Sequence, residues 1–253
     1  MSNQIISKTP KEISIMKEGG KKLAEVKKKL GEAVKEGENA YKIEELANEL
    51  IKKAGGKASF KMVPNYDWAT CVNVNEGVVH GIPKKETVFK DGDVVSIDVG
   101  IYYKGFHTDT SLTVAINPDK ETKKFLGVGM EALTKAISKC VPGNHIYDIS
   151  KAIEDTLEKN ELSPIKALVG HGIGRALHEE PHIQCFTKEK RQKTPVIPEG
   201  ATMAIEVMYT RGSSDLILEN DGWTISTRNG KIASLFEETV AVIGGGSVVL
   251  TKN

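Results

Sequence analysis

The sequence predicts an α+β fold in which helices pack on an antiparallel sheet. Three observations support this class: helical periodicity near the N-terminus, a long β-branched region before residue 117, and a repeat of helices followed by strands in the rest of the chain. Because helices and strands are segregated, the pattern favours antiparallel pairing over a parallel β-α-β sheet. We expect one domain, residues 1–253, with an internal duplication whose halves cover about 9–117 and 118–243.

Two helices are predicted before residue 55. The sequence T-P-K-E at residues 9–12 places a capping residue, a proline and a glutamate in the order typical of a helix start. Apolar residues then recur mostly at three- and four-residue steps as far as Val34, with Gly19-Gly20 as a weak point inside the helix. A second helix is expected over residues 41–54, ending at two glycines.

The middle of the chain carries the strongest β signals. The runs TCVNVN, VVSIDVGIYY and FHTDTSLTVAI are rich in β-branched residues, and a short turn near Lys104-Gly105 separates the last two, which predicts a β-hairpin. Helices are expected again at residues 118–140 and 146–158. Further strands are predicted at residues 201–209, 216–218, 222–227 and 232–243.

Composition gives no sign of a nucleic-acid or membrane protein. The formal charge is +1, from 35 basic and 34 acidic residues, so DNA is not an expected partner. No stretch approaches the ~20 apolar residues that span a bilayer, and the N-terminus has no apolar signal region. Three cysteines without paired spacing favour a reducing compartment. We therefore expect a cytoplasmic monomer with no membrane partner. The lysine-rich stretch 21–29 is interpreted as the solvated face of the first helix, with ribosomal RNA contact as the alternative.

Two aspartates in the predicted hairpin indicate a metal site. Asp98 and Asp109 are eleven residues apart (109 minus 98), so a turn near residues 103–105 without a bulge places both on one sheet face, within about 8 Å. Asp98 lies in an apolar strand. Burying a charged carboxylate there costs ~3 kcal/mol or more of free energy unless a cation or hydrogen-bond donors compensate it. A metal is the simplest explanation, and a turn cap or a lysine partner is the alternative.

Three residues further along add to this set. His171 lies in G-H-G-I-G-R, while Glu206 in M-A-I-E-V-M and Glu237 in L-F-E-E-T again stand in apolar strands. Four carboxylates with one imidazole form an oxygen and nitrogen donor set, which suits Mn, Fe(II), Co, Zn or Ni. It is unlike the cysteine-rich set of a thiolate metal site. Because carboxylates such as Asp109 and Glu237 can bridge ions, the set is compatible with a two-metal hydrolase.

Two other histidines stand beside turn signals, where backbones carry functional side chains to a cleft: His80 in V-V-H-G-I-P and His178 in L-H-E-E-P. The glycines around His171 do not match the dinucleotide spacing, so we interpret them as sites of close backbone approach. No G-x-S-x-G pattern supports a serine hydrolase.

Read together, several motifs resemble the type I methionine aminopeptidases. They are TCVNVNEGVVHGIP, DGDVVSIDVG, GFHTDTS, GHGIGRALHEEP and DGWTIST, and they occur in the family's order between residues 9 and 242. The resemblance implies the pita-bread fold, a curved antiparallel sheet with helices on its outer face and pseudo-two-fold symmetry. It also implies that a dinuclear centre is held by Asp98, Asp109, His171, Glu206 and Glu237.

The resemblance further assigns individual roles. Asp109 and Glu237 would bridge the ions, and Glu237 is chosen over Glu238, which would point to the opposite face of its strand. His80 and His178 would contact the substrate and the tetrahedral intermediate, and Glu206 would be the general base. The methionine pocket would be lined by Cys71, Tyr66, Leu177 and Trp223.

Two positions depart from the family's usual pattern: Val207 replaces a proline, and Leu177 an aromatic residue. Only 31 residues separate Glu206 from Glu237 (237 minus 206), which is too short for the extra subdomain of type II enzymes.

The implied function is removal of the initiator methionine from nascent polypeptide N-termini when the second residue is small. The ribosome surface is a further expected contact. One alternative is a proline-specific peptidase of the same fold, which would generally carry a sizeable N-terminal domain. Another is a protein of this fold that has lost catalysis and only binds partners or RNA; the presence of all five ligand types argues against it, and a metal assay of the purified protein would separate the two.

Overall fold

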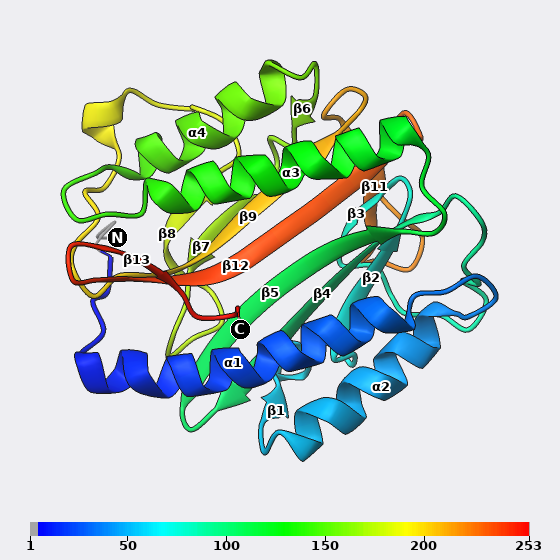
Figure 1. Cartoon of the computed structure of the whole chain (residues 1–253), viewed down its shortest axis with the longest axis horizontal. Helices are drawn as coiled ribbons and strands as arrows, with labels where there is room; N and C mark the ends of the chain where they lie inside the picture. Colours follow the sequence, from blue (N-terminus) through cyan, green and yellow to red (C-terminus); the bar gives the residue numbers. More distant parts are fainter. Residues whose placement is uncertain (1–4, 253) are drawn as a thin grey trace.

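A ten-stranded sheet runs through the molecule, and two pairs of helices lie on one of its faces (Figure 1). This computed structural model describes residues 5–252. Its helices are α1 (Pro10–Ala33), α2 (Ala40–Lys53), α3 (Lys120–Ser138) and α4 (Ile146–Glu158). Its strands are β1 (Lys57–Ala58), β2 (Thr70–Val74), β3 (Gly77–Val79), β4 (Val94–Tyr103), β5 (Phe106–Ala115), β6 (Ser163–Pro164), β7 (Val169–Gly172), β8 (Glu179–Gln184), β9 (Thr202–Thr210), β10 (Leu216–Leu218), β11 (Ile225–Thr227), β12 (Ala233–Ile243) and β13 (Gly246–Val249).

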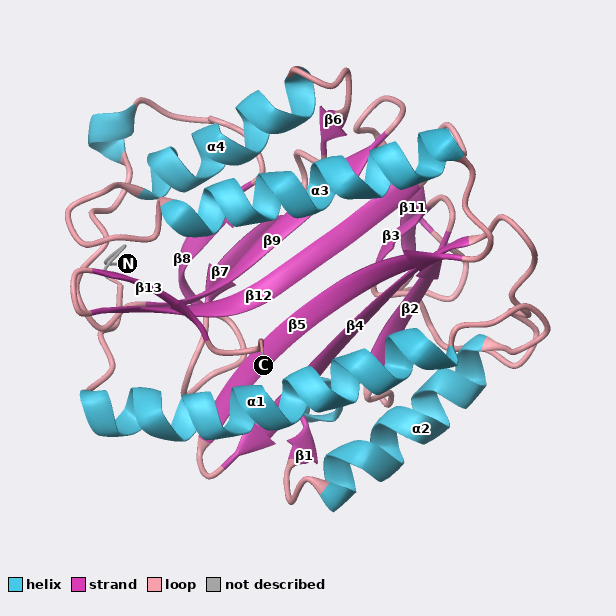
Figure 2. Ribbon diagram, in the orientation of Figure 1, coloured by secondary structure: helices cyan, strands magenta, loops and turns pink. Residues whose placement is uncertain are grey.

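The pairing of the strands is antiparallel throughout the described chain, as the sequence predicted. The main order is β1-β4-β5-β12-β9-β7-β8, with β2 beside β4, β6 beside β9 and β13 beside β12; a small second sheet has the order β10-β11-β3. Helix α1 packs on β4 and β5, whereas α3 packs on β9 and β12 (Figure 2). This is the predicted α+β arrangement.

The start of α1 follows the sequence signal. The Thr9 hydroxyl accepts a hydrogen bond from the Glu12 N–H, and the Glu12 carboxylate accepts one from the Thr9 N–H. The expected weak point at Gly19-Gly20 does not interrupt the helix. A Cβ added to Gly20 would lie 2.4 Å from the Leu250 carbonyl oxygen, so the glycine allows the C-terminal segment to pack against α1.

The predicted hairpin forms as β4 and β5. Lys104 and Gly105 connect the strands with φ values of 48° and 94°, as a tight two-residue hairpin turn requires. The pairing runs from Val94↔Ala115 to Tyr103↔Phe106 without a register shift. Odd-numbered residues of β4, such as Ile97, pack beneath α1 and α2, and Asp98 therefore projects from the opposite face.

Some strands differ from the prediction. The expected strand at residues 222–227 begins only at Ile225, because the Asp221 carboxylate accepts hydrogen bonds from the N–H groups of Trp223 and Thr224, which removes them from sheet pairing. Strands β1, β3, β6, β7, β8 and β13 were not predicted. Each has six residues or fewer, which is too short to show a clear alternation.

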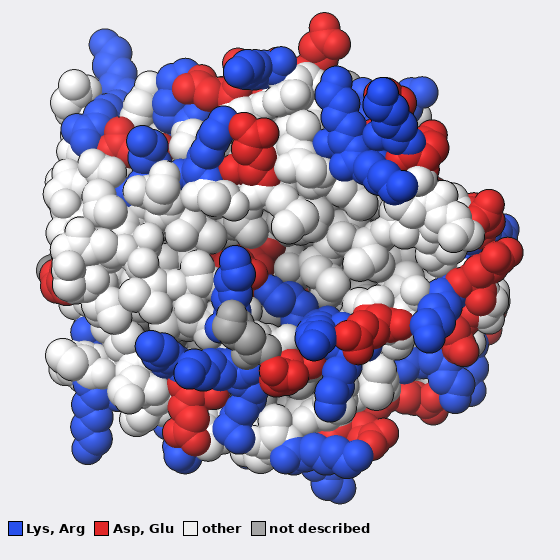
Figure 3. Space-filling model, viewed as in Figure 1, with Lys and Arg blue, Asp and Glu red and all other residues white. Residues whose placement is uncertain are grey.

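The two halves have similar contents, since each contributes two helices and part of the main sheet; the internal duplication itself stays a prediction. Among residues 5–252, no helix has the length and apolarity to cross a membrane. Figure 3 shows both signs of charge mixed along the helix-covered face, with uncharged surface between the helix pairs. Lys27 is an exception to the predicted solvated face of α1: its ammonium group turns inward and contacts Glu238 at 2.7 Å.

Candidate metal centre

A cavity of about 400 Å³ is lined by the acidic residues on the sheet face opposite the helices. All the residues that the sequence singled out for the site line this cavity, although they come from both halves of the chain. They are Tyr66, Cys71, His80, Asp98, Asp109, His171, Leu177, His178, Glu206, Trp223 and Glu237.

The sheet register brings the four carboxylates together. Asp98 pairs with Ser111, and Asp109 pairs with Gly100, so the two aspartates are diagonal neighbours on one face, as predicted. Glu237 lies directly opposite Glu206 in the β12–β9 pairing. Four adjacent strands, β4, β5, β12 and β9, therefore each supply one carboxylate to the cavity.

Glu238 lies on the other side of the sheet. Its carboxylate accepts hydrogen bonds from Lys27 at 2.7 Å, Thr110 at 3.1 Å and Thr251 at 2.5 Å. It therefore belongs to the helix-covered face, whereas Glu237 is 2% exposed and lines the cavity. This placement is what the strand alternation predicts for neighbouring residues.

The acidic cluster is unfavourable without a cation. Desolvation, followed by the charges of neighbouring carboxylates, raises the pKa of Asp98, Glu206 and Glu237 well above the usual range. Burial also raises the pKa of Asp109, to about 7. Asp98 Oδ1 is buried without a hydrogen-bond partner among the described residues. A divalent ion would compensate both the repulsion and this missing partner, so the residues fit a metal.

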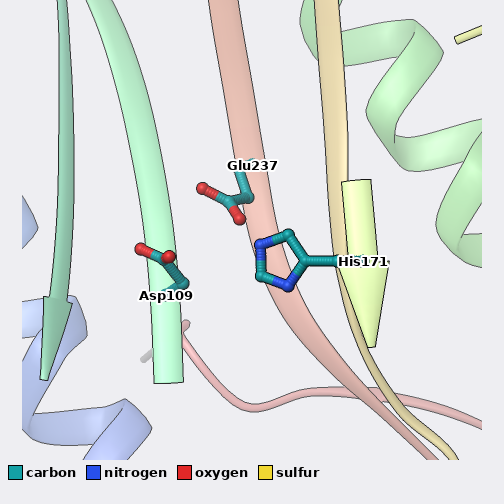
Figure 4. A group of neighbouring side chains, drawn as sticks. All are labelled: Asp109, His171 and Glu237. Carbon is teal, nitrogen blue, oxygen red and sulfur yellow. The ribbon is translucent and has the colours of Figure 1, made fainter. Parts of the chain in front are cut away.

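His171 is prepared to act as a neutral ligand. Its Nδ1–H donates to the Gly172 carbonyl at 2.9 Å, which leaves the Nε2 lone pair free, 3.6 Å from Glu206 Oε1. Burial lowers the pKa of His171 to about 3. Ligand atoms of Asp109, His171 and Glu237 lie within 4.8 Å of one another. Figure 4 shows that the three side chains point toward one another. Asp98 and Glu206 line the same cavity outside this inner group.

The glycines beside His171 permit close strand packing, as expected. A Cβ on Gly172 would lie 2.2 Å from the Glu180 carbonyl oxygen, and one on Gly170 would lie 2.6 Å from that of Ala204. Strands β8 and β9 therefore both approach the backbone at His171.

Apolar and aromatic side chains form one wall of the cavity. The rings of Tyr66 and Trp223 meet edge to face with centroids 5.0 Å apart, and the Tyr66 hydroxyl donates to the Thr70 carbonyl at 2.9 Å. Cys71 Sγ lies 3.2 Å from the same hydroxyl oxygen, and Leu177 is 8% exposed. Such a wall suits an uncharged, flexible side chain next to the acidic cluster.

Two neutral histidines border the acidic cluster. Burial is the main cause that lowers the pKa of both His80 and His178. The His178 ring lies 4.5 Å from that of His171, and His80 has a φ of 57°, a left-handed conformation uncommon for a residue with a Cβ. Each neutral imidazole carries one N–H donor that a substrate carbonyl can use.

The sequence analysis missed several lining residues, including Phe60, His182 and Met208. His182 is paired with His171 across β7 and β8, and its place four residues after His178 is a signal that could have drawn attention to it. Val207, which departs from the family pattern, is fully buried among core residues and does not line the cavity, so its effect on the site is indirect.

Comparison with known proteins gives consistent matches over nearly the whole chain. The model of metallopeptidase family M24 matches residues 14–243. The chain is 39% identical to the methionine aminopeptidase of Aquifex aeolicus, over 96% of both chains, and 37% identical to methionine aminopeptidase 1 of Bacillus subtilis, over 98% of this chain and 99% of that one. The crystal structure of methionine aminopeptidase from Thermotoga maritima superposes with a TM-score of 0.95 at 39% identity and covers 99% of this chain and 100% of that one. A prolidase from Pyrococcus furiosus shares the fold at 20% identity, with a TM-score of 0.76, over 98% of this chain and 66% of that one.

Proposed function

The chain belongs to metallopeptidase family M24, and we propose that it removes the N-terminal methionine of new polypeptides when the second residue is small. Its fold is the pita-bread fold that the sequence motifs implied. The observation that carries the proposal is an acidic cluster with one neutral imidazole, directly beside a pocket walled by Tyr66, Cys71 and Trp223. The first feature suits metal-assisted hydrolysis, and the second suits a methionine side chain.

We propose that Asp98, Asp109, His171, Glu206 and Glu237 would hold two divalent ions, with Asp109, His171 and Glu237 at the centre of the ligand set. The donor set consists of carboxylate oxygens and one imidazole nitrogen, and it is compatible with Co, Mn, Fe(II), Zn or Ni. When bound, such ions supply an activated water and polarise the carbonyl of the scissile bond. Coulombic repulsion within the cluster would be relieved by the same ions.

The protein's own groups handle protons and orientation. Glu206 is the proposed general base, because its carboxylate lines the cavity with the other acidic groups and its Oε1 lies 3.6 Å from His171 Nε2. His178 and His80 are neutral and donate N–H hydrogen bonds to the developing oxyanion and to the substrate amide. Because these donors stand outside the five ligands, losing one would lower turnover without removing metal.

The aromatic wall sets specificity in this proposal. Trp223 is held by the loop at Asp221, whose carboxylate accepts from the N–H groups of residues 223 and 224 and is paired with Lys84 at 2.6 Å. Trp223→Ala would therefore lower kcat/KM for Met-Ala peptides, by about 10-fold or more if ~1.5–3 kcal/mol of side-chain contact is lost, with metal content unchanged. Norleucine in place of methionine should remain a substrate.

The test is a peptide series assayed after reconstitution with each of several divalent metals. Peptides Met-Xaa with Xaa as Gly, Ala, Ser, Leu and Lys, together with Ala-Ala and Xaa-Pro controls, separate the candidates. Cleavage limited to small second residues after methionine supports the proposal. Efficient cleavage of Ala-Ala or Met-Lys would contradict it, preference for Xaa-Pro would indicate the proline-specific alternative, and metal binding without cleavage would indicate a binding protein.

We also propose the setting in which the enzyme acts. A type I enzyme of this kind would work as a monomer in the cytoplasm and meet its substrates as they leave the ribosome. Sedimentation of the purified chain with ribosomes that carry nascent polypeptides, at low and high salt, tests this contact.

A further inference from the structure

A buried ion pair lies behind the wall of the cavity. The Lys8 backbone N–H donates to the Gly200 carbonyl at 2.7 Å, which fixes the segment that precedes α1. Lys8 is only 4% exposed, and its ammonium group contacts the Glu179 carboxylate directly. The same ammonium group donates to the Ile6 carbonyl at 3.1 Å. This pair connects the N-terminal segment to the start of β8.

The partner carboxylate uses its other oxygen on a loop. Glu179 Oε1 accepts the backbone N–H groups of Arg175 at 2.7 Å and Ala176 at 3.1 Å, while Oε2 faces Lys8. The loop then continues into Leu177 and His178, both of which line the cavity. Lys8 and Glu179 do not line it.

The same loop is held from two further directions. The His107 N–H donates to the Gly174 carbonyl at 2.7 Å, and the Arg175 guanidinium pairs with Glu12 in the first turn of α1. A Cβ on Gly174 would lie 2.3 Å from Lys8 Cε, so the lysine side chain fills the space under the loop. Packing and hydrogen bonding thus both connect the N-terminal segment to this loop.

We propose that Lys8 and Glu179 are positioning residues that hold residues 174–178 in the conformation in which His178 meets the reacting carbonyl. The proposal rests on the function proposed above for His178. Burying an ion pair contributes little net stability compared with apolar residues of the same volume. One oxygen of the Glu179 carboxylate contacts Lys8, and the other accepts hydrogen bonds from the loop amides. This arrangement indicates that the pair fixes the position of the loop.

The main experiment is a double-mutant cycle between Lys8→Met and His178→Ala on the metal-loaded enzyme. Alone, Lys8→Met should lower kcat roughly 10- to 100-fold, as expected for a misplaced catalytic group, with KM changed less than about twofold and metal content unchanged. In the His178→Ala background it should have almost no further effect on kcat. Lys8→Arg should restore most of the turnover. An equal loss in both backgrounds, or unchanged kcat, would overturn the proposal.

Lys27→Met provides the matched control, because Lys27 also pairs with a glutamate, Glu238, but on the helix-covered face away from the cavity. It should leave kcat unchanged. Hydrogen exchange at the amides of Arg175 and Ala176 needs no substrate and should become faster in Lys8→Met but not in Lys27→Met. If the wild type cleaves no methionyl peptide but the exchange responds, the proposed function fails while the loop contact stands. If exchange does not respond, the positioning role is excluded.

Discussion

Two sets of buried carboxylates in this molecule have opposite surroundings. Glu44 in α2 is 4% exposed and accepts hydrogen bonds from the Ala69 N–H at 2.9 Å, from the Thr70 N–H at 3.0 Å and from the Thr70 hydroxyl at 2.8 Å. Asp98 lies in the largely buried strand β4, yet its Oδ1 has no donor among the described residues and its neighbours include other carboxylates. A buried carboxylate therefore does not by itself indicate a metal site. A buried carboxylate that lacks hydrogen-bond donors from the protein is the better indicator.

The two kinds of buried carboxylate have different roles: one stabilises the fold, and the other suits the binding of a cation. Glu44 ties the first residues of β2 to α2 and so fixes the strand that presents Cys71 to the cavity. The acidic cluster instead stores electrostatic repulsion that a cation relieves. Substituting members of each set should thus change different observables.

The largest effect is expected for Asp98→Asn and Asp109→Asn. Each removes a charge that the proposed ions need, so metal content should fall and kcat/KM should drop by more than about 100-fold, beyond the loss typical of residues that only support ligands. Metal analysis and peptide hydrolysis measure both quantities. Full activity with unchanged metal stoichiometry in both variants would show that the acidic cluster, like Glu44, does not bind metal.

Glu44→Gln should have the converse result. The amide loses the charge and two of the acceptor positions that serve residues 69 and 70, so the free energy of unfolding should fall by about 2–4 kcal/mol. Metal content should not change, because the side chain does not line the cavity. Urea unfolding of the metal-loaded protein is the measurement, and a loss of metal without a loss of stability would show that Glu44 belongs with the acidic cluster.

The pH dependence of the metal-free protein tests the repulsion directly. Folding raises the pKa values of the cluster, to about 7 for Asp109, so the folded chain binds more protons than the unfolded chain, and stability falls as pH rises through these values. Between about pH 7.5 and 8.5, at least one unit above the unperturbed imidazole pKa of ~6.5, the histidines with lowered pKa values are mostly neutral in both states. Urea unfolding should therefore show a declining free energy across this window.

Asp98→Asn is the control for this experiment, since it removes one charge from the cluster and should flatten the decline. Saturating metal should also flatten it, because the ions favour the ionised carboxylates. A metal-free wild type whose stability rises over the same window would contradict the assignment of the cluster as a site of stored repulsion.

The sequence alone could predict the β4–β5 half of the site. Alternating β-branched residues and a glycine at the turn determine the register, and the register puts Asp98 and Asp109 on one face. The surroundings of His171 could not be predicted in this way. Strands β7 and β8 are short and their register shifts between His171 and Gly172, so the pairing depends on tertiary contacts with β9.

Some lining residues depend on contacts between distant parts of the chain. Phe60 stands in a short 3₁₀ turn and reaches the cavity beside Tyr66, with ring centroids 6.4 Å apart. No periodicity marks it, because its placement comes from packing and not from an element's alternation. The choice of Glu237 over Glu238 likewise came from family resemblance, since both residues share one apolar strand.

The smallest effect is expected for Glu238→Gln, compared with Glu237→Gln one position away. Both residues lie in β12, but Glu238 faces Lys27 and Thr251 under α1, where a half-buried ion pair and a hydroxyl already satisfy it. Its substitution should cost about 1–2 kcal/mol of stability and change kcat/KM less than about twofold. Glu237→Gln should reduce metal content and activity as strongly as Asp98→Asn does. Because the two changes are chemically identical and the backbone is shared, only the face of the strand differs. Equal losses of activity in the two variants would show that the helix-covered face also contributes to the metal centre, and the reverse order would assign the ligand to Glu238.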